Sequence, residues 1–258
     1  MFVFRYINFD AKLQNLMDRV TMIGKTLLVL VLLLCIALEG EAQKAPNMVD
    51  SNGLKQGKWE KYDANGRLVY TGTFLNDLPV DTFNYYFDNG MKKAQLIYGS
   101  EEVSREALSK IFNRKGMLMS EGSYLRKKRH GYWRFYDEEG QMISEEYYDE
   151  GKKVGVWKVY YYDGTLNEET SYEEDKKSGP WKQYFTDGSL KLKGMYRNGL
   201  LEGESMYFHP NGKVMIHGSY IHNLKHGKWF FYDEEGVLVK EQEYRMGKPL
   251  EEPDDREE

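Results

Sequence analysis

The stretch that decides the fold is Gly131-Tyr-Trp-Arg-Phe-Tyr136-Asp-Glu-Glu-Gly140, and variants of it recur along the chain. Its closing glycine has counterparts every 24 residues downstream, at Gly164, Gly188, Gly212 and Gly236, and others upstream at Gly116, Gly90 and Gly66. Only the step from Gly90 to Gly116 is longer, at 26 residues. A fixed period of this length is typical of repeat proteins, so we expect about eight units that pack against their neighbours.

Aromatic residues recur at fixed distances from this turn glycine, which we number position 0. Position +8 is aromatic in all eight units: Phe74, Tyr98, Tyr124, Tyr148, Tyr172, Tyr196, Tyr220 and Tyr244. Position −7 is aromatic in six: Trp59, Phe83, Trp133, Trp157, Trp181 and Trp229, with Ser109 and Ser205 in the other two. Position −4 is aromatic throughout, from Tyr62 to Tyr232. The expected structural or interaction residues are Trp59, Trp133, Trp157, Trp181, Trp229, Tyr148, Tyr172, Tyr196 and Tyr220.

Each unit reads as two strands around a turn. Asn89-Gly90 and Asp163-Gly164 are hairpin signals, because glycine accepts positive φ and Asn or Asp tolerates it. Polar links such as Asp149–Gly155 read as a second turn. The predicted fold is therefore all-β, an elongated antiparallel β-hairpin array in which position +8 pairs with the next unit's −7 to form an aromatic ladder. Positions −7 and −4 differ in parity, so either both faces carry rings or a bulge separates them.

The repeats are predicted to span residues 53–248, after a linker at 43–52 and before an acidic, disordered tail at 249–258. The long step interrupts the period near residues 100–112. There Val103, Ala107, Leu108 and Ile111 have helical spacing, which favours a short helix or a bulged loop.

The amino terminus has the pattern of an export signal. Thr26–Leu38 is an uncharged apolar run, preceded by Lys25 and followed by the small residues Gly40 and Ala42. We expect residues 1–42 to be a signal peptide that is cleaved after Ala42, with Met22 as an alternative true start. The protein would then be exported, to the periplasm, the outer-membrane surface or the medium. The alternative is an uncleaved membrane anchor formed by residues 23–38.

No catalytic, cofactor or metal site is predicted. The net charge is −5, and the acidic tail accounts for it, so no basic stripe for nucleic acid is evident. His217, His222 and His226 lie close in sequence but lack partners at a metal-site spacing. The acid pairs at Glu138 and Glu234 fall in turns, where solvated carboxylates are common.

The unit Gly-x-Trp-x-x-Tyr/Phe-x-x-x-Gly-x-Leu resembles the MORN-repeat variant, most clearly in residues 131–155 and 227–247. The resemblance covers residues 53–248. It implies hairpin arrays that contact proteins or membranes and have no catalytic residues of their own. We therefore expect a non-enzymatic exported scaffold whose partner is an unknown protein or envelope component. The alternatives are an antitoxin or immunity-type protein, and an envelope glycan binder that uses exposed rings.

Overall fold

The structure, a computed structural model, describes residues 46–99 and 106–250. The chain divides into two compact units, Met1–Pro46 and Asn47–Glu258. Only Pro46 of the first unit is described, so the fold that follows is that of the second unit. The predicted signal segment, residues 1–42, lies outside the described residues.

The described part of the chain is all-β, with twenty strands in one antiparallel sheet and no helix. Sixteen of these strands have six or more residues. They are β2 (Lys55–Tyr62), β3 (Leu68–Leu75), β4 (Leu78–Tyr86), β5 (Lys92–Tyr98), β6 (Glu106–Phe112), β7 (Leu118–Leu125), β8 (Lys128–Tyr136), β9 (Met142–Asp149), β11 (Gly155–Tyr160), β12 (Leu166–Glu173), β13 (Lys176–Tyr184), β14 (Leu190–Arg197), β16 (Gly203–Phe208), β17 (Val214–Ile221), β18 (Leu224–Tyr232) and β19 (Leu238–Arg245). The two-residue strands are β1 (Met48–Val49), β10 (Lys152–Lys153), β15 (Leu200–Leu201) and β20 (Lys248–Pro249).

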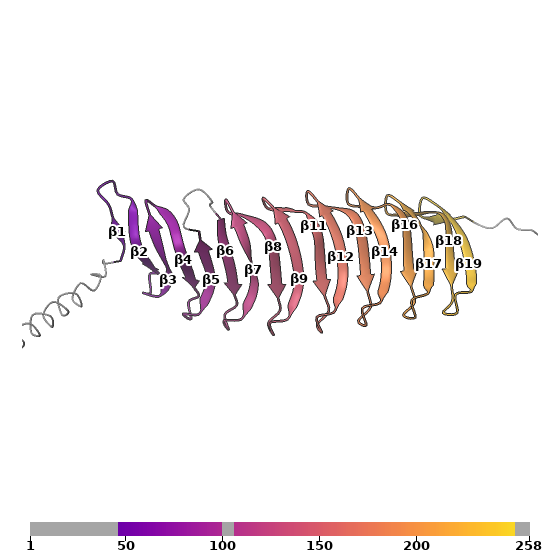
Figure 1. The fold of residues 1–258 in the computed structure, drawn as a ribbon, viewed down its shortest axis with the longest axis horizontal. Coiled ribbons are helices and arrows are strands. Elements are labelled where there is room, and N and C mark those ends of the chain that lie inside the picture. The colour runs from indigo at the N-terminus through magenta and orange to yellow at the C-terminus, as the bar shows by residue number, and fades with distance from the viewer. Residues whose placement is uncertain (1–45, 100–105, 251–258) are drawn as a thin grey trace, which may run out of the picture. The chain divides into compact units, whose positions relative to one another are not determined.

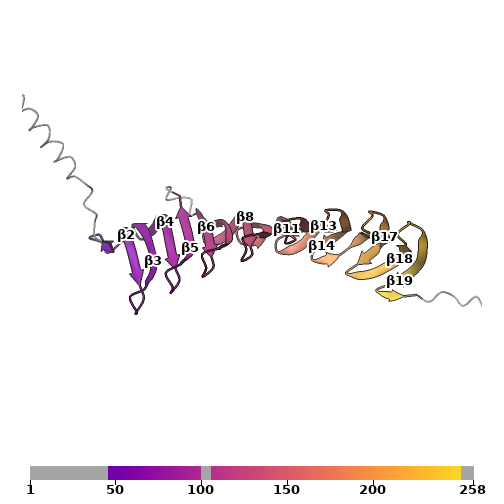
Figure 2. The same ribbon diagram turned by 90° about the horizontal axis from the view of Figure 1, so that it is seen from below.

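The sixteen longer strands form eight hairpins, one around each turn glycine, as the period predicts. Each strand pairs with the one before and the one after it, as β7–β8 and β8–β9 illustrate, so the sheet is a meander. Figures 1 and 2 show the strands following one another in chain order along the sheet. The predicted hairpin array of about eight units is confirmed.

The described links between hairpins are tight turns with two consecutive residues at positive φ. Examples are Asn198 and Gly199, with φ of 50° and 87°, and Arg126 and Lys127, with φ of 50° and 68°. Two positive φ angles match the twist of antiparallel strands, which explains why Gly and Asn recur there. The polar links are therefore turns, as predicted.

A register shift lies just before position −4 in the hairpins, for example between Phe135 and Tyr136. The rings at −4 nevertheless lie on the face opposite to those at −7. The hydroxyl of Tyr136 donates to Glu121 over 2.9 Å, and that of Tyr184 donates to Glu169 over 2.8 Å. Both explanations of the parity change therefore hold: there is a bulge, and both faces carry rings.

The core of the sheet lies on one face only, which we call the ladder face because it carries positions −7 and +8. Strand alternation assigns every buried side chain of the described residues to this face. These side chains are Phe83, Ala107, Ser109, Ser120, Trp133, Tyr148, Thr170, Leu192, Ser205 and Trp229. The hairpins are therefore held together along a single apolar layer.

The short helix expected near residues 100–112 is wrong over its carboxy-terminal half. Residues Glu106–Phe112 form β6, which pairs with both β5 and β7. Alternate residues Ala107 and Ser109 are buried, whereas Leu108 is exposed, which is a strand pattern. Two neighbouring strands offer a complete set of hydrogen-bond partners, and this context outweighs the helical spacing. Residues 100–105 lie outside the described part.

Two predicted boundaries also need correction. The sheet begins inside the expected linker, because Met48 and Val49 of β1 pair with Gln56 and Lys55. It ends inside the expected tail, because Pro249 pairs with Tyr244 and the Leu250 amide donates to the Glu243 carbonyl over 2.8 Å. An exposed sheet edge offers unpaired backbone groups, and a short added strand satisfies some of them. Residues 251–258 lie outside the described part.

Candidate functional site

The predicted aromatic ladder exists on the ladder face. Trp157 contacts a tyrosine on either side, with ring centroids 5.2 Å from Tyr148 and 4.8 Å from Tyr172. The other four tryptophans each contact the ring at +8 of their own unit or of the unit before. The centroid distances are 5.8 Å for Trp59–Phe74, 5.0 Å for Tyr124–Trp133, 5.4 Å for Trp181–Tyr196, 5.0 Å for Tyr220–Trp229 and 6.2 Å for Trp229–Tyr244.

The register differs from the expected direct pairing of +8 with −7. Tyr124 lies opposite Arg129, and Trp133 lies opposite Gly122. The two rings meet diagonally, which long aromatic side chains can do.

Trp133 and Trp229 are buried structural residues, whereas Trp157 and Trp181 are half-buried. The side chains of Trp133 and Trp229 are 0% exposed. Their indole N–H groups donate to backbone carbonyls ten residues upstream, at Ser123 over 2.9 Å and at Ser219 over 3.2 Å. A buried indole with a satisfied N–H has little capacity left for a ligand.

Glycines at position +6 make room for the rings. A Cβ atom on Gly122 would lie 2.4 Å from the ring of Trp133, and one on Gly218 would lie 2.2 Å from that of Trp229. Gly72 lies in the same way beneath Phe83, at 2.3 Å. These glycines therefore serve close packing between adjacent hairpins.

Basic side chains cover the ladder, a feature that was not predicted from the sequence. Position −11, four residues before position −7, is basic in six units: Lys55, Arg105, Arg129, Lys153, Lys177 and Lys225, of which Arg105 lies outside the described residues. The Lys225 ammonium lies 4.4 Å from the Trp229 ring centroid, and the Arg129 guanidinium lies 4.7 Å from that of Trp133. Such cation–π contacts stabilise by about 0.5–2 kcal/mol each. The signal that could have revealed them is the recurrence of Lys or Arg at −11.

The burial of this layer also changes its acid–base properties. Burial and the hydrogen bond to Glu146 raise the pKa of Tyr148 to about 12. Burial, with Lys240 nearby, lowers the pKa of Lys225. Both shifts follow from desolvation on the ladder face.

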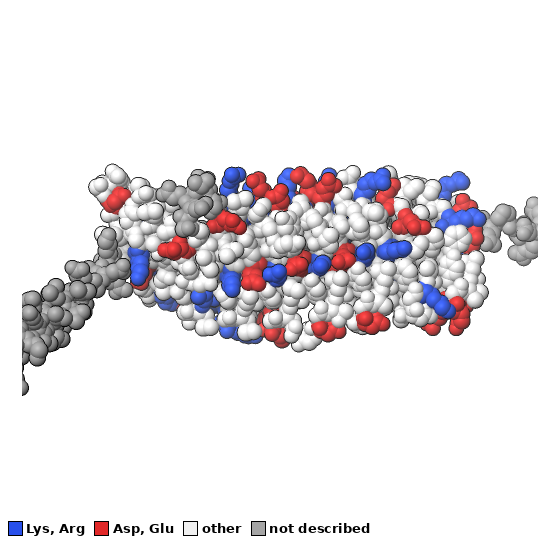
Figure 3. Space-filling view, in the orientation of Figure 1, with Lys and Arg blue, Asp and Glu red and all other residues white. Residues whose placement is uncertain are grey.

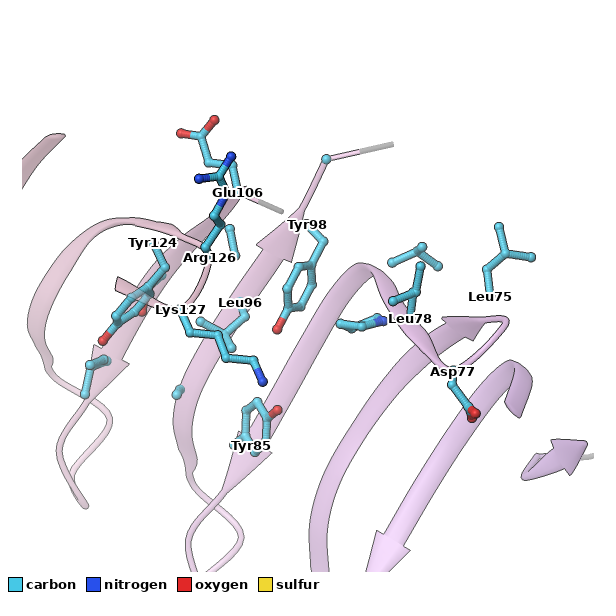
Figure 4. A pocket seen from close by; sticks show the side chains of 17 residues that line it. Leu75, Asp77, Leu78, Tyr85, Leu96, Tyr98, Glu106, Tyr124, Arg126 and Lys127 are labelled. Carbon is cyan, nitrogen blue, oxygen red and sulfur yellow. The ribbon is translucent and has the colours of Figure 1, made fainter. Parts of the chain in front are cut away.

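The ladder is interrupted where serine replaces the tryptophan, and the two interruptions differ. At Ser205, Tyr207 lies two residues further along the same face, and its hydroxyl is 3.0 Å from that of Tyr220. At Ser109, the corresponding residue is the smaller Ile111, and a cavity of about 930 Å³ lies beside it. Its lining includes Tyr85, Leu96, Tyr98, Ser109, Tyr124 and Lys127 (Figure 4).

The opposite face carries a row of charges that alternate in sign from β6 to β13 and end in two neighbouring lysines. Successive partners across the strands are Lys110, Glu121, Arg134, Glu145, Lys158, Glu169, Lys182 and Lys193. Figure 3 shows a row of alternating blue and red running along the middle of this face. Arg134 lies 3.1 Å from Glu145, measured between Nε and a carboxylate oxygen. Opposite charges across strands stabilise the sheet modestly and fix its register.

A row of mostly apolar side chains lies beside these charges, interrupted by Ser123 in β7 and Ser171 in β12. Leu108 is 55% exposed and Tyr132 is 58% exposed. Ile97, Val156 and Met195 are also exposed, at positions of the same parity. Together, the two rows form an amphipathic surface across β5 to β14, which we call the charged face.

The histidines make separate local contacts. His217 Nε2 lies 2.7 Å from Glu204 Oε1, and His222 lies in a link turn, where its backbone N–H donates to Glu202. His130 Nδ1 lies 3.2 Å from Asp149 Oδ1, without the alignment of a hydrogen bond. Within residues 46–99 and 106–250, no three His, Cys, Asp or Glu side chains are grouped to hold a metal ion. No helix in these same ranges has the length and apolarity to cross a membrane.

Comparison with solved structures gives only weak likenesses. One crystal structure, of TcdB2-TccC3-TEV, aligns at 11% identity over 74% of this chain and 11% of that chain, with a TM-score of 0.20. A porin-like protein from Bacteroides uniformis ATCC 8492 aligns at 10% identity over 75% of this chain and 91% of that chain, with a TM-score of 0.19. No curated protein sequence matches the chain significantly.

The family comparison is more informative. The MORN repeat variant model matches residues 55–76, 129–150, 153–174, 177–198, 201–222 and 225–246. These segments span just over half of the chain and coincide with six of the eight hairpins. The units around Gly90 and Gly116, which flank the cavity, are the two that the model does not match. The chain therefore belongs to the MORN repeat variant family.

Proposed function

We propose that the protein is an exported, non-enzymatic scaffold that binds a protein partner of the cell envelope through its charged face. MORN repeats suggest a repeat scaffold for protein or membrane interaction. The observation that carries the proposal is the exposure of Leu108, Tyr132 and Val156 directly beside the alternating charges. Exposed apolar side chains that gather on one face often mark interaction surfaces.

The chemistry of the charged face favours a protein partner. Aromatic and apolar side chains at the centre of an interface contribute most of its affinity. Surrounding charges of both signs select a partner with the complementary pattern. The ladder face offers less surface for binding, because Trp133 and Trp229 are buried and covered by cations.

We expect the double variant Tyr132→Asp/Val156→Asp to lose binding to the proposed partner protein. The immobilised protein, incubated with an envelope fraction, should retain one specific protein that the variant does not retain. Buried carboxylates without partners are unfavourable at an interface, so affinity should fall at least about 100-fold. The control is Val237→Asp/Val239→Asp, which places the same two charges on exposed valines in and next to β19, away from the row. Capture of the same protein at the same level by both variants would contradict this surface.

Binding rather than catalysis is the proposed activity, and a scan of polar residues separates the two. A binding surface spreads its energy over many contacts, so no single polar substitution should abolish function. The scan covers His130, His217, His222, His226, Glu138 and Glu234. Complete loss of function from one of them, with an unchanged circular dichroism spectrum, would point to an enzyme instead.

Export rests on the apolar run Thr26–Leu38 and the small residues before Gln43. We expect mass spectrometry of the protein recovered from the envelope or medium to find an amino terminus at or near Gln43. Recovery of a protein that still contains residues 23–38 would favour the membrane anchor.

A further inference from the structure

The interruption at Ser109 creates a site that differs from the regular units of the described sheet. In those units, a ring at −7 lies between two rings at +8, as Trp157 lies between Tyr148 and Tyr172. Around Ser109 both +8 residues are present, Tyr98 and Tyr124, but the ring between them is missing. Both tyrosines line the cavity. Tyr98 and Tyr124 therefore flank an aromatic slot that lacks the −7 ring found there in the regular units.

The floor of this slot has an unpaired polar group. Ser109 is 3% exposed, and among the described residues its hydroxyl oxygen has no hydrogen-bond partner. A buried hydroxyl without a partner is unfavourable, because its lost hydration is not replaced by a hydrogen bond. The equivalent Ser205 is also buried, but the neighbouring cavity does not include it. The loss of tryptophan alone therefore does not explain the cavity.

The rim of the slot carries charges of both signs, because Asp77 and Glu106 line the cavity as well as two cations. Arg126 and Lys127 form the turn between β7 and β8, and both line the cavity. Arg126 pairs with Glu150 over 3.5 Å, but no carboxylate of the described residues lies within ion-pair distance of Lys127. Figure 4 shows Lys127 extending toward Tyr85 across the opening.

The backbone at this rim also departs from the repeat. Lys127 holds a φ of 68° at position +11, where the other described links have Asp77, Gly151, Asp175, Gly199, Asn223 and Gly247. Those residue types tolerate positive φ, whereas lysine does so at a cost, and such strain tends to persist where a side chain is needed.

We propose that this cavity binds a small planar aromatic carboxylate, whose ring takes the place of the missing tryptophan between Tyr98 and Tyr124 and whose carboxylate pairs with Lys127. Tyrosine rings on both sides favour a flat ring in offset or edge contact. Leu96, Ala107 and Ile111 provide an apolar surround, and the Ser109 hydroxyl is free to donate or accept one hydrogen bond. The volume of about 930 Å³ lies in the range of about 300–1,000 Å³ that is usual for small-molecule sites. The site is on the ladder face, so it is independent of the partner surface proposed above.

The test is calorimetric titration of the full chain with 2-naphthoate, and with 2-naphthamide as an uncharged ligand of the same shape. We expect saturable binding of one 2-naphthoate per chain and about 10-fold weaker binding of the amide, as one charge-assisted contact allows. Lys127→Gln should weaken the binding of 2-naphthoate about 10-fold and leave the affinity for 2-naphthamide unchanged. Lys176→Gln, a matched change beside another link turn, should alter neither. No saturable binding of either ligand would overturn the proposal, and an unchanged 2-naphthoate affinity in Lys127→Gln would overturn the role of the carboxylate.

Filling the slot gives an independent check. Ser109→Trp restores the ring of the regular units and should abolish binding of both ligands. If that variant does not fold, Leu96→Gly/Ser109→Trp recreates the Gly122–Trp133 arrangement and should fold without binding. A folded variant of either kind that binds 2-naphthoate as well as the parent would contradict the location of the site.

Discussion

Replacing Trp133 with alanine is expected to lower the free energy of unfolding by about 4 kcal/mol, within the range of about 3–5 kcal/mol for large aromatic truncations in packed sites. The ring is fully buried, donates its N–H to Ser123, contacts Tyr124 and lies beneath the Arg129 guanidinium. Alanine leaves a cavity and removes all of these contacts. Urea denaturation followed by circular dichroism measures the change.

Two further variants provide a comparison for the loss of stability expected in Trp133→Ala. Tyr148→Ala removes a smaller buried ring and should lower the free energy of unfolding by about 3 kcal/mol. Glu138→Ala should change stability by less than about 0.5 kcal/mol. Glu138 pairs with Lys115 over 2.7 Å, but both side chains are exposed, and such pairs contribute little. Equal losses from Trp133→Ala and Glu138→Ala would mean that the ring ladder is not the core.

Gly122→Ala is expected to destabilise the protein by about 2–3 kcal/mol, an effect of overpacking alone. The added methyl group would lie 2.4 Å from the Trp133 ring, which is held by its hydrogen bond and by Tyr124. Gly122 does not have a positive φ, so its backbone could otherwise accept alanine. The variant should also shift the tryptophan emission spectrum, because the Trp133 ring must move.

Gly194→Ala is the matched control. Gly194 occupies the same position, +6, but the next unit has Ser205 in place of tryptophan. The nearest atom to an added Cβ is the Ser205 hydroxyl oxygen at 3.0 Å, which can rotate away. Alanine also restricts the unfolded chain, so the net change should be within about 1 kcal/mol of zero. If the two variants lose equal stability, the close packing of glycine beneath tryptophan is not the cause.

The architecture can be predicted well from the sequence, because the residue pattern within each repeat is sufficient to indicate its turns and strands. The spacing of Gly140, Gly164 and Gly188 is enough to locate the hairpins, and Tyr148 and Trp157 meet as expected. The prediction is wrong at β6, because the spacing of Ala107 and Ile111 matches one face of a helix. There the strands on either side decide the outcome, and that information is not local.

The candidate sites are harder to predict from the sequence than the fold. The alternation of Arg134, Glu145 and Lys158 becomes visible only when the register places them side by side. The cavity at Ser109 depends on what surrounds the missing ring. Ser205 has the same substitution without such a cavity, because Tyr207 replaces the smaller Ile111. Pattern alone does not distinguish these two serines.

Hydrogen exchange of the five tryptophan indole N–H groups, followed by nuclear magnetic resonance, tests most directly whether the rings form the core or an exposed binding platform. The signals of Trp133 and Trp229 should exchange slowly, because both N–H groups are buried and donate to backbone carbonyls. The Trp59 N–H also donates to a backbone carbonyl, that of Met48 over 3.2 Å, but it should exchange faster because Trp59 is partly exposed near the edge of the sheet. If Trp133 and Trp229 exchange as fast as Trp59, the rings are open to solvent, and the assignment of stability to the ladder face and binding to the charged face is wrong.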